Sequence, residues 1–156
     1  MCCKKIRKAV TYSEMVEAGR RIKEAGIKLS ATVFLGLGGI EKSIEHAIDT
    51  AKILSEIDPD YASALTLMVV PGTPLYAEYI SGSYIMPDKF SMLKELALIV
   101  ENSNFTRCYF TSNHASNYLP VKAMLPDEKE KTVRMIYDVV GANDVKLLRA
   151  EHLGGL

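Results

Sequence analysis

The sequence contains few cysteines. Only three of its 156 residues are Cys: Cys2 and Cys3 are adjacent, and Cys108 lies far along the chain. An odd number in this arrangement argues against a disulfide framework. Free thiols together with seven methionines favour a reducing compartment, so a cytoplasmic protein is predicted. Cys108 lies in an apolar run and is expected to pack as a small hydrophobic residue.

The sequence also lacks an excess of charge and a long apolar run. Nineteen basic side chains balance nineteen acidic ones, and no basic block provides a surface for duplex nucleic acid or anionic lipid. Near-apolar runs such as residues 64–71 are well short of the roughly 20 residues that a membrane-spanning helix needs. We therefore expect no nucleic-acid partner, no membrane span and, because no apolar stretch follows residues 1–5, no export.

Clusters of metal ligands are absent as well. The three histidines, His46, His114 and His152, are far apart, and none forms a group with the cysteines at the spacing of a metal site. The sequence therefore predicts no metal site in this chain, and we single out no catalytic residue.

Hydrophobic residues make up 48% of the chain, and folding at this length is expected to bury roughly 70% of the unfolded surface. A helix is predicted from Thr11 to Ala25, since Thr11 and Glu14 have the spacing of a capping box and Gly26 suits a left-handed helix end. A second helix is expected over residues 41–57. Its predicted inward face consists of Ile40, Ile44, Ala47, Ile48, Ala51 and Leu54. Further helices are expected at 74–80, from Pro87 and from Pro126.

Three apolar segments predict strands, at residues 27–35, 61–70 and 105–111. They alternate with helices, and the second is apolar on both faces, which is typical of a parallel sheet with helical crossovers. We therefore predict an α/β fold with three mainly parallel strands and flanking helices. Residues 1–125 contain this sheet, and residues 126–156 are expected to form a final helix and a frayed tail.

Two glycine-containing segments follow predicted strands, at residues 36–39 and 70–74. Open α/β sheets and barrels bind ligands at such strand-to-helix junctions. The dinucleotide pattern G-x-G-x-x-G is not met, because Glu41 stands where the third glycine belongs. A plain turn and a ligand-binding loop therefore both remain open interpretations.

The densest polar group, Asn113, His114 and Asn117, follows the third predicted strand. Such residues serve in turns and helix caps, and they are also candidates for binding a substrate. We carry both interpretations forward.

Three segments, GRRIKEAGI at 19–27, VFLGLG at 33–38 and VPGTPL at 70–75, resemble the second half of a radical S-adenosylmethionine Fe–S oxidoreductase of the oxygen-independent coproporphyrinogen-oxidase-like group. The segment FTSNHASNYLP at 110–120 resembles a stretch that follows the barrel in one branch of that group. The resemblance implies a partial (β/α) barrel. It also implies S-adenosylmethionine and a [4Fe–4S] cluster as cofactors of the whole enzyme.

The cluster-binding motif Cys-x-x-x-Cys-x-x-Cys is missing from the chain, although three thiolates at that spacing hold the cluster in such enzymes. The resemblance therefore implies a fragment that lacks the N-terminal half of the barrel, binds neither cofactor by itself and is inactive alone.

Matched positions imply a surface that contacts the cofactor. Thr32 corresponds to a ribose contact, Phe34 to the apolar residue on adenine, and Gly36 and Leu37 to the wall beside it. Gly39 stands where the family has a glutamate, so the correspondence ends at Leu37.

Three further positions complete the implied cofactor site. Val70 and Pro71 correspond to a backbone contact with adenine. Lys8 lies near a family arginine that pairs with the cofactor carboxylate, although an ordinary solvated lysine is the competing interpretation. Asn113, His114 and Asn117 are the predicted substrate-binding residues.

Two other functions stay open: a stand-alone α/β interaction module and a nucleotide-binding module of another class, both without catalysis. A half-barrel would expose one sheet face and one strand edge, and such surfaces pair with other chains. We therefore expect a homo-oligomer, most simply a two-fold dimer, or a complex with the missing N-terminal half.

Overall fold

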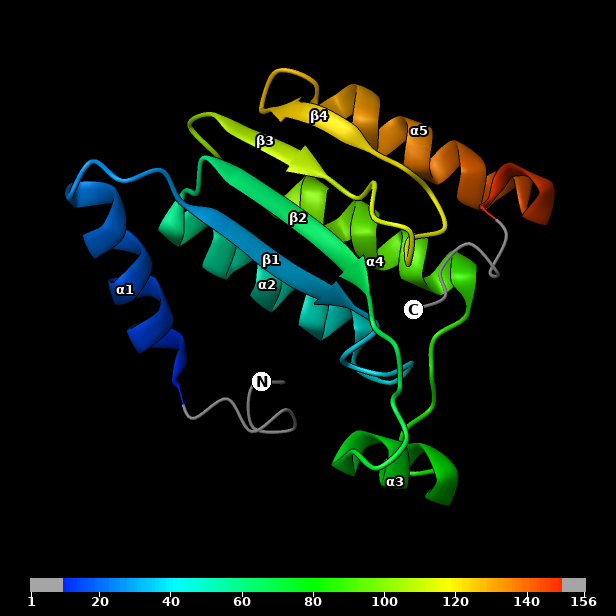
Figure 1. Cartoon of the computed structure of the whole chain (residues 1–156). Coiled ribbons are helices and arrows are strands. Elements are labelled where there is room, and N and C mark those ends of the chain that lie inside the picture. Colours follow the sequence, from blue (N-terminus) through cyan, green and yellow to red (C-terminus); the bar gives the residue numbers. More distant parts are fainter. Residues whose placement is uncertain (1–9, 150–156) are drawn as a thin grey trace.

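The computed structural model describes residues 10–149. Helices and strands follow one another along the chain (Figure 1). They are α1 (Tyr12–Glu24), β1 (Ser30–Leu35), α2 (Ser43–Ile57), β2 (Tyr61–Thr66), α3 (Pro74–Ser81), α4 (Lys89–Asn102), β3 (Cys108–Thr111), β4 (Lys122–Leu125), α5 (Lys129–Ala142) and the short 3-10 helix η2 (Val145–Leu147). Every helix in this range is too short or too polar to span a bilayer.

The four strands form one open sheet in the order β1-β2-β3-β4. β1 and β2 are parallel, β2 and β3 are parallel, and β4 runs antiparallel to β3. The predicted α/β fold with mainly parallel strands and flanking helices is therefore confirmed. The expected number of three strands is wrong, because β4 is a fourth strand. Its four residues are too few to show a clear alternation in sequence, and pairing with β3 defines it.

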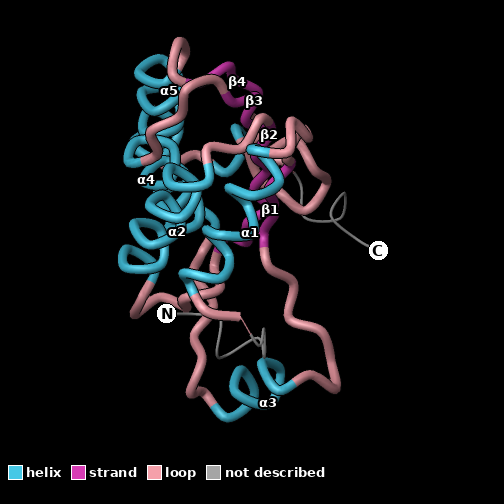
Figure 2. Tube along the Cα trace, turned by 90° about the vertical axis from the view of Figure 1, so that its left-hand side faces the viewer, coloured by secondary structure: helices cyan, strands magenta, loops and turns pink. Residues whose placement is uncertain are grey.

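Among residues 10–149, helices cover one face of the sheet and leave the other face uncovered. Figure 2 shows α2, α4 and α5 along one side of the strands. Ala62, Ala64 and Phe110 point to that side and are buried in the core. On the opposite face Phe34 and Tyr109 are exposed. This face also carries the hydroxyl residues Thr32, Ser63 and Thr111, which lie side by side in register.

β2 is shorter than predicted and is not apolar on both faces. It ends at Thr66, after which Leu67 N–H donates to Leu35 C=O (3.0 Å) and the chain leaves the sheet. Met68 and Val70 are exposed. The expected strand 61–70 is therefore wrong over residues 67–70, because the turn at Pro71 and Gly72 takes this segment away from its neighbours.

Both predicted ends of the first helix are confirmed. Glu14 accepts from Thr11 N–H (2.6 Å) while Glu14 N–H donates to Thr11 Oγ1 (3.3 Å), as a capping box requires. At the other end Gly26 has φ +74°. Gly26 N–H donates to Lys23 C=O and Ile27 N–H to Ile22 C=O, which closes the helix in a left-handed cap.

The predicted inward face of α2 is partly wrong. Ile44 is 69% exposed, Ile40 is 50% exposed and Ile48 is 40% exposed. The buried residues of α2 are His46, Ala47, Thr50, Ala51 and Leu54. The helix turns its small residues toward the sheet and α4, since alanines allow a close approach and a buried partner binds His46.

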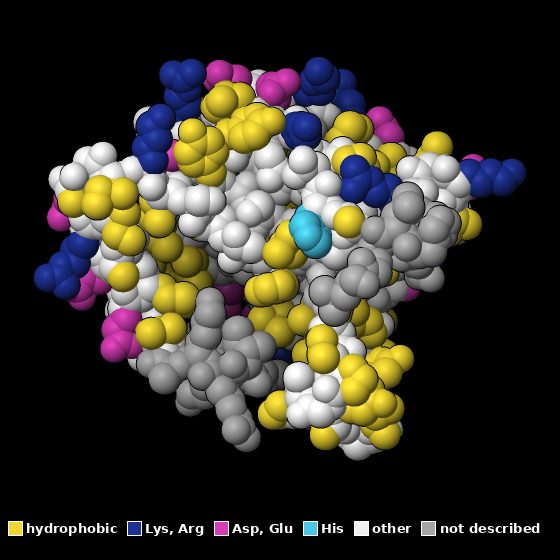
Figure 3. All heavy atoms as spheres, in the orientation of Figure 1, with side chains coloured by type: hydrophobic (Ala, Val, Ile, Leu, Met, Phe, Trp, Pro, Cys, Tyr) yellow, Lys and Arg dark blue, Asp and Glu magenta, His cyan; other side chains and the backbone are white. Residues whose placement is uncertain are grey.

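Two elements complete the fold. α3 buries no residue and stands away from the sheet in both views (Figures 1 and 2). Tyr79 and Ile80 of α3 are exposed, and Figure 3 shows hydrophobic side chains gathered there. In contrast, α5 packs on α4 and contributes the fully buried Ile136 to the core.

Candidate functional site

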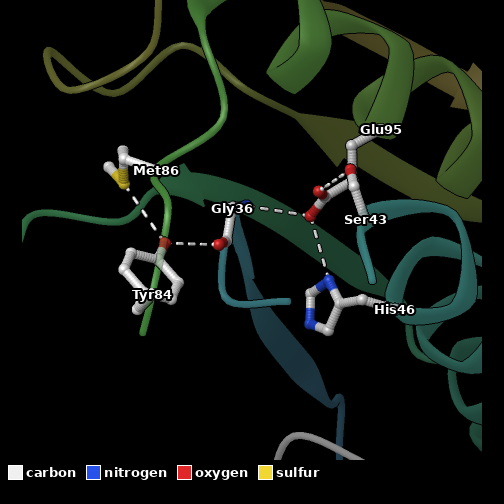
Figure 4. Close-up of polar contacts among 6 residues, drawn as sticks. All are labelled: Gly36, Ser43, His46, Tyr84, Met86 and Glu95. Atoms are coloured by element: carbon white, nitrogen blue, oxygen red, sulfur yellow. Dashed lines mark hydrogen bonds and ion pairs between the residues drawn. The ribbon is translucent and has the colours of Figure 1, made fainter. Parts of the chain in front are cut away.

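The loop that follows β1 is held through both backbone polar groups of Gly36. Gly36 N–H donates to Oε1 of Glu95 (2.9 Å), and Gly36 C=O accepts from the hydroxyl of Tyr84 (2.6 Å), as Figure 4 shows. Gly36 has φ +87°, a conformation that glycine adopts readily. The end of β1 is thereby fixed to α4 and to the segment that returns from α3.

Gly38 brings the same loop against the first turn of α2. A Cβ atom at Gly38 would lie 2.6 Å from the backbone oxygen of Lys42. No side chain fits at that distance without backbone movement. The glycines after β1 are therefore required for close packing, which supports the interpretation as a structural turn and leaves ligand binding open.

A buried hydrogen-bonded cluster lies directly behind this loop. The carboxylate of Glu95 is fully buried. It accepts from Gly36 N–H, from the hydroxyl of Ser43 and from Nδ1 of His46 (2.9 Å). Figure 4 shows these groups converging from the end of β1 and the start of α2 on Glu95 of α4. The carboxylate accepts all three of these hydrogen bonds, and together they offset the cost of burying it.

Sequence analysis alone did not identify the pair of His46 and Glu95. The available signal was Glu95, an acidic residue between Leu93 and Leu96 on the buried side of α4. A charged residue on an apolar helix face implies a buried partner. The identity of this partner could not be obtained from spacing along the sequence, because His46 is 49 positions away from Glu95.

A cleft of about 430 Å³ lies between α1, β1 and α2. Its apolar lining includes Met15, Phe34, Leu37 and Ile53, and Tyr12 adds a second aromatic side chain. The polar residues of its lining are Thr32, Lys42, Glu45, His46, Asp49, Thr50 and Lys52. Its volume is within the range of small-molecule sites.

The structure brings three of the predicted cofactor residues to this cleft. Thr32, Phe34 and Leu37 line it. Phe34 is 41% exposed, and Oγ1 of Thr32 lies 3.2 Å from Oγ of Ser63 on the uncovered sheet face. Gly36 lies next to them, but both of its backbone polar groups are used within the protein. It can shape the wall without donating to a ligand.

The other predicted cofactor residues are elsewhere. Val70 and Pro71 lie in the exposed loop after β2 and are not part of the cleft lining. Val70 C=O accepts from the hydroxyl of Thr73 (2.7 Å), which caps α3. Lys8 lies outside the described residues.

The three predicted substrate-binding residues are not part of the cleft lining, and their surroundings differ. Asn117 is buried, and its amide donates to Ala64 C=O (2.7 Å) and Ser112 C=O (3.0 Å) and accepts from the Thr66 hydroxyl (3.0 Å). Asn113 and His114 are exposed. Asn117 therefore ties the end of β2 to the loop between β3 and β4, while the other two face solvent.

Residues 10–149 contain no set of side chains that could hold an iron–sulfur cluster. No group of three His, Cys, Asp or Glu side chains that could hold a metal is present in this range. Cys108 lies on the covered face of the sheet, and burial raises the pKa of its thiol to about 12. A thiol in this state is a poor metal ligand, because metals bind the thiolate. The residues present do not fit a [4Fe–4S] cluster.

Comparison with known proteins shows limited similarity. No family model matches the chain. An uncharacterized protein of Methanocaldococcus jannaschii is 26% identical over 123 residues, which are 79% of this chain and 34% of that relative. The matched segment thus spans about a third of the length of this curated relative.

Proposed function

We propose that the chain is part of a radical S-adenosylmethionine Fe–S oxidoreductase of the oxygen-independent coproporphyrinogen-oxidase-like group. In this proposal it contributes the surface against adenine and ribose and part of the substrate site, and it is inactive alone. The observation that carries the proposal is the position of Thr32 and Phe34. Both lie on the uncovered face of a parallel sheet and line the cleft beside the glycine loop.

A partial barrel accounts for the two faces of the sheet. In a closed (β/α) barrel one sheet face lines the interior and the other meets the helices. In residues 10–149 the helices α2, α4 and α5 lie on one side, and β1 has no neighbouring strand on its outer edge. The preceding strands of a barrel would extend the sheet at β1. The antiparallel strand β4 occupies the other side of β3.

In this proposal the described residues would hold the adenosyl part of the cofactor and not the cluster. Phe34 offers an exposed aromatic face, Leu37 an apolar wall and Thr32 a hydroxyl group. When bound to a cluster, S-adenosylmethionine supplies a carbon radical for hydrogen abstraction. The cluster ligands would belong to the missing half, and this chain would bind and orient the nucleoside part.

The test uses the reading frame upstream of the Met1 codon. We expect a polypeptide with Cys-x-x-x-Cys-x-x-Cys, which assembles a [4Fe–4S] cluster anaerobically and cleaves S-adenosylmethionine when combined with this chain. The chain alone is expected to do neither. A stoichiometric cluster and cofactor cleavage by this chain alone, or an upstream frame without the motif, would contradict the proposal.

One observation favours the second candidate, a stand-alone interaction or nucleotide-binding module. The described residues share one hydrophobic core, to which β4 beside β3 and α5 on α4 both contribute. Within residues 10–149 every buried side-chain polar atom has a hydrogen-bond partner. Such a core is consistent with independent folding, so a stable monomer would favour this candidate.

A further inference from the structure

The helix α3 is exposed although its sequence is largely apolar. None of its eight residues is buried, Tyr79 is exposed and Ile80 is 66% exposed. Hydrophobic side chains gather on this helix in Figure 3. Glu78 is the only charged residue in the sequence from 67 to 87, which includes α3 and both segments beside it. Apolar side chains gathered on an exposed element mark an interaction surface.

Hydrogen bonds at both ends stabilise α3 as a helix. Helices shorter than roughly 12 residues are marginal without packing. At the start of α3, Thr73 Oγ1 accepts from Tyr76 N–H (3.2 Å). At the other end Glu78 C=O accepts from Ser83 N–H (3.0 Å) and Tyr84 N–H (3.1 Å). The caps therefore maintain a helix that contributes no buried side chain to the core.

The same residues tie α3 to the loop after β1. The hydroxyl of the buried Tyr84 donates to Gly36 C=O (2.6 Å), and Ile40 N–H donates to Ile85 C=O (3.0 Å). Hydrogen bonds thus run from the last turn of α3 to the end of β1, and α3 projects beyond the carboxyl ends of β1 and β2 (Figure 1). A helix held in this way loses less conformational entropy when a partner binds it.

The size and charge of α3 argue against two kinds of partner. Its eight residues span about 12 Å, whereas a stable interface occupies about 800 Å² on each protein. Pairing of α3 with α3 of a second copy is therefore too small. Residues 67–87 contain no Lys or Arg, and attachment to an anionic lipid surface relies on basic side chains. An apolar groove in a polypeptide that also contacts this chain elsewhere fits α3 better.

The place of α3 in the fold indicates which polypeptide this is. In a (β/α) barrel the loops at the carboxyl ends of all strands surround one mouth. Since α3 follows the carboxyl end of β2, the corresponding loops of strands that precede β1 would meet it there. The matched segment is 34% of the curated relative, so most of that protein lies outside it.

We propose that α3 is a docking helix whose Tyr79 and Ile80 insert into an apolar groove formed by the carboxyl-end loops of the missing N-terminal half. The inference rests on the proposed function, which supplies this half as the partner. Docking of α3 adds a second contact between the two halves, separate from strand pairing at the outer edge of β1.

Two double variants test this contact. Tyr79→Gln combined with Ile80→Gln removes the exposed apolar side chains of α3 and introduces residues that favour a helix. Met135→Gln combined with Tyr137→Gln is the matched control, because it removes one exposed aliphatic and one exposed aromatic side chain from α5. Calorimetry measures the affinity of each for the polypeptide encoded upstream of the Met1 codon. Urea denaturation checks the folding of each variant.

We expect the α3 variant to bind the upstream polypeptide about 30-fold more weakly than the unmodified chain does, as for two buried anchor residues. The α5 variant should keep the affinity. The α3 variant should unfold at the same urea concentration as the unmodified chain, because neither Tyr79 nor Ile80 is buried. Amide hydrogens of α3 should exchange rapidly in the isolated chain and become protected in the complex.

An unchanged affinity of the α3 variant, or no protection of α3 on binding, would overturn the inference. Failure of the unmodified chain to bind the upstream polypeptide would overturn it as well. If the α3 variant instead abolishes self-association of this chain, or its binding to vesicles of phosphatidylcholine and phosphatidylserine, then a second copy or a lipid surface covers α3 and the inference is wrong.

The same experiment separates the docking of α3 from the proposed function. Cluster assembly and cofactor cleavage by the unmodified pair, with an unchanged affinity of the α3 variant, would contradict only the docking role. Binding that depends on Tyr79 and Ile80 to an upstream polypeptide without a cluster would contradict only the proposed function.

Discussion

Nδ1 of His46 lies 2.9 Å from Oε1 of Glu95, across 49 positions of sequence. This contact joins the start of α2 to α4, and through Gly36 N–H it also reaches the end of β1 (Figure 4). These hydrogen bonds tie three elements to one buried carboxylate, so the position of the loop after β1 depends on Glu95.

Replacing this carboxylate should destabilise the protein. In Glu95→Gln the amide oxygen can still accept from Gly36 N–H and His46 Nδ1, and the amide NH2 can donate to the Ser43 hydroxyl, but the bonds that a carboxylate accepted are replaced in a buried site by weaker bonds to a neutral amide. We expect the free energy of unfolding to fall by about 2–3 kcal/mol, measured by urea denaturation. The control Glu101→Gln, on the exposed part of the same helix, should change it by less than about 0.5 kcal/mol. Equal effects of the two substitutions would contradict a special role for Glu95.

Gly38 and Gly141 provide a matched pair of substitutions. A Cβ at Gly38 would meet the Lys42 backbone oxygen at 2.6 Å, whereas at Gly141 nothing lies within 4 Å. Gly38→Ala should therefore lower the free energy of unfolding by about 1–3 kcal/mol. Gly141→Ala should raise it by about 0.5 kcal/mol or more, because alanine favours the helix. If chemical denaturation shows that both substitutions change the free energy of unfolding in the same direction, the predicted close packing at Gly38 is wrong.

Asn117 is predicted to contribute to the stability of the fold rather than to substrate binding. Asn117→Ala leaves the Thr66 hydroxyl and the carbonyls of Ala64 and Ser112 without this partner. We expect a loss of about 2–4 kcal/mol in the free energy of unfolding. The exposed Asn113→Ala should cost less than about 0.5 kcal/mol. Thermal unfolding checks both, and a neutral Asn117→Ala would favour the substrate-binding interpretation.

Cys108 should make stability depend on alkaline pH. Burial, as the main cause, raises the pKa of the Cys108 thiol from 9.0 to about 12. The unfolded thiol loses its proton first, so the stabilisation by this group is complete below pH 9 and is lost as the pH rises toward 12. The difference in unfolding free energy between the unmodified chain and Cys108→Ala should be constant below pH 9 and shrink above it. A constant difference throughout would show that the thiol is not desolvated.

The uncovered sheet face should drive self-association of the isolated chain. Phe34, Tyr61 and Tyr109 are exposed on this face, and such apolar surfaces favour pairing with another copy. We expect concentration-dependent dimers in sedimentation experiments, weakened by Phe34→Lys. A monomer at tens of micromolar without binding of an apolar dye would contradict the half-barrel and favour the self-contained module.

Local signals in the sequence were sufficient for much of the fold. The capping box of Thr11 and Glu14 and the left-handed Gly26 both act through backbone groups within a few residues, so they fix the ends of α1 wherever the helix packs. The apolar segments around β1 and β2 predicted parallel strands for a similar reason. Residues 67–70 were misassigned, since hydrophobicity alone does not show where a chain leaves its sheet.

The sequence by itself determined the alternation of strands and helices, because periodicity and caps are local properties of the chain. Tertiary structure decided the pairing of β4 with β3, the rotation of α2 that exposes Ile44, and the meeting of His46 with Glu95. Each depends on contacts between distant segments, whose partners no spacing along the chain specifies. The candidate site belongs to this second group: Thr32 and Phe34 were singled out in the sequence by a resemblance, but only the folded chain places them with His46 in the lining of one cleft.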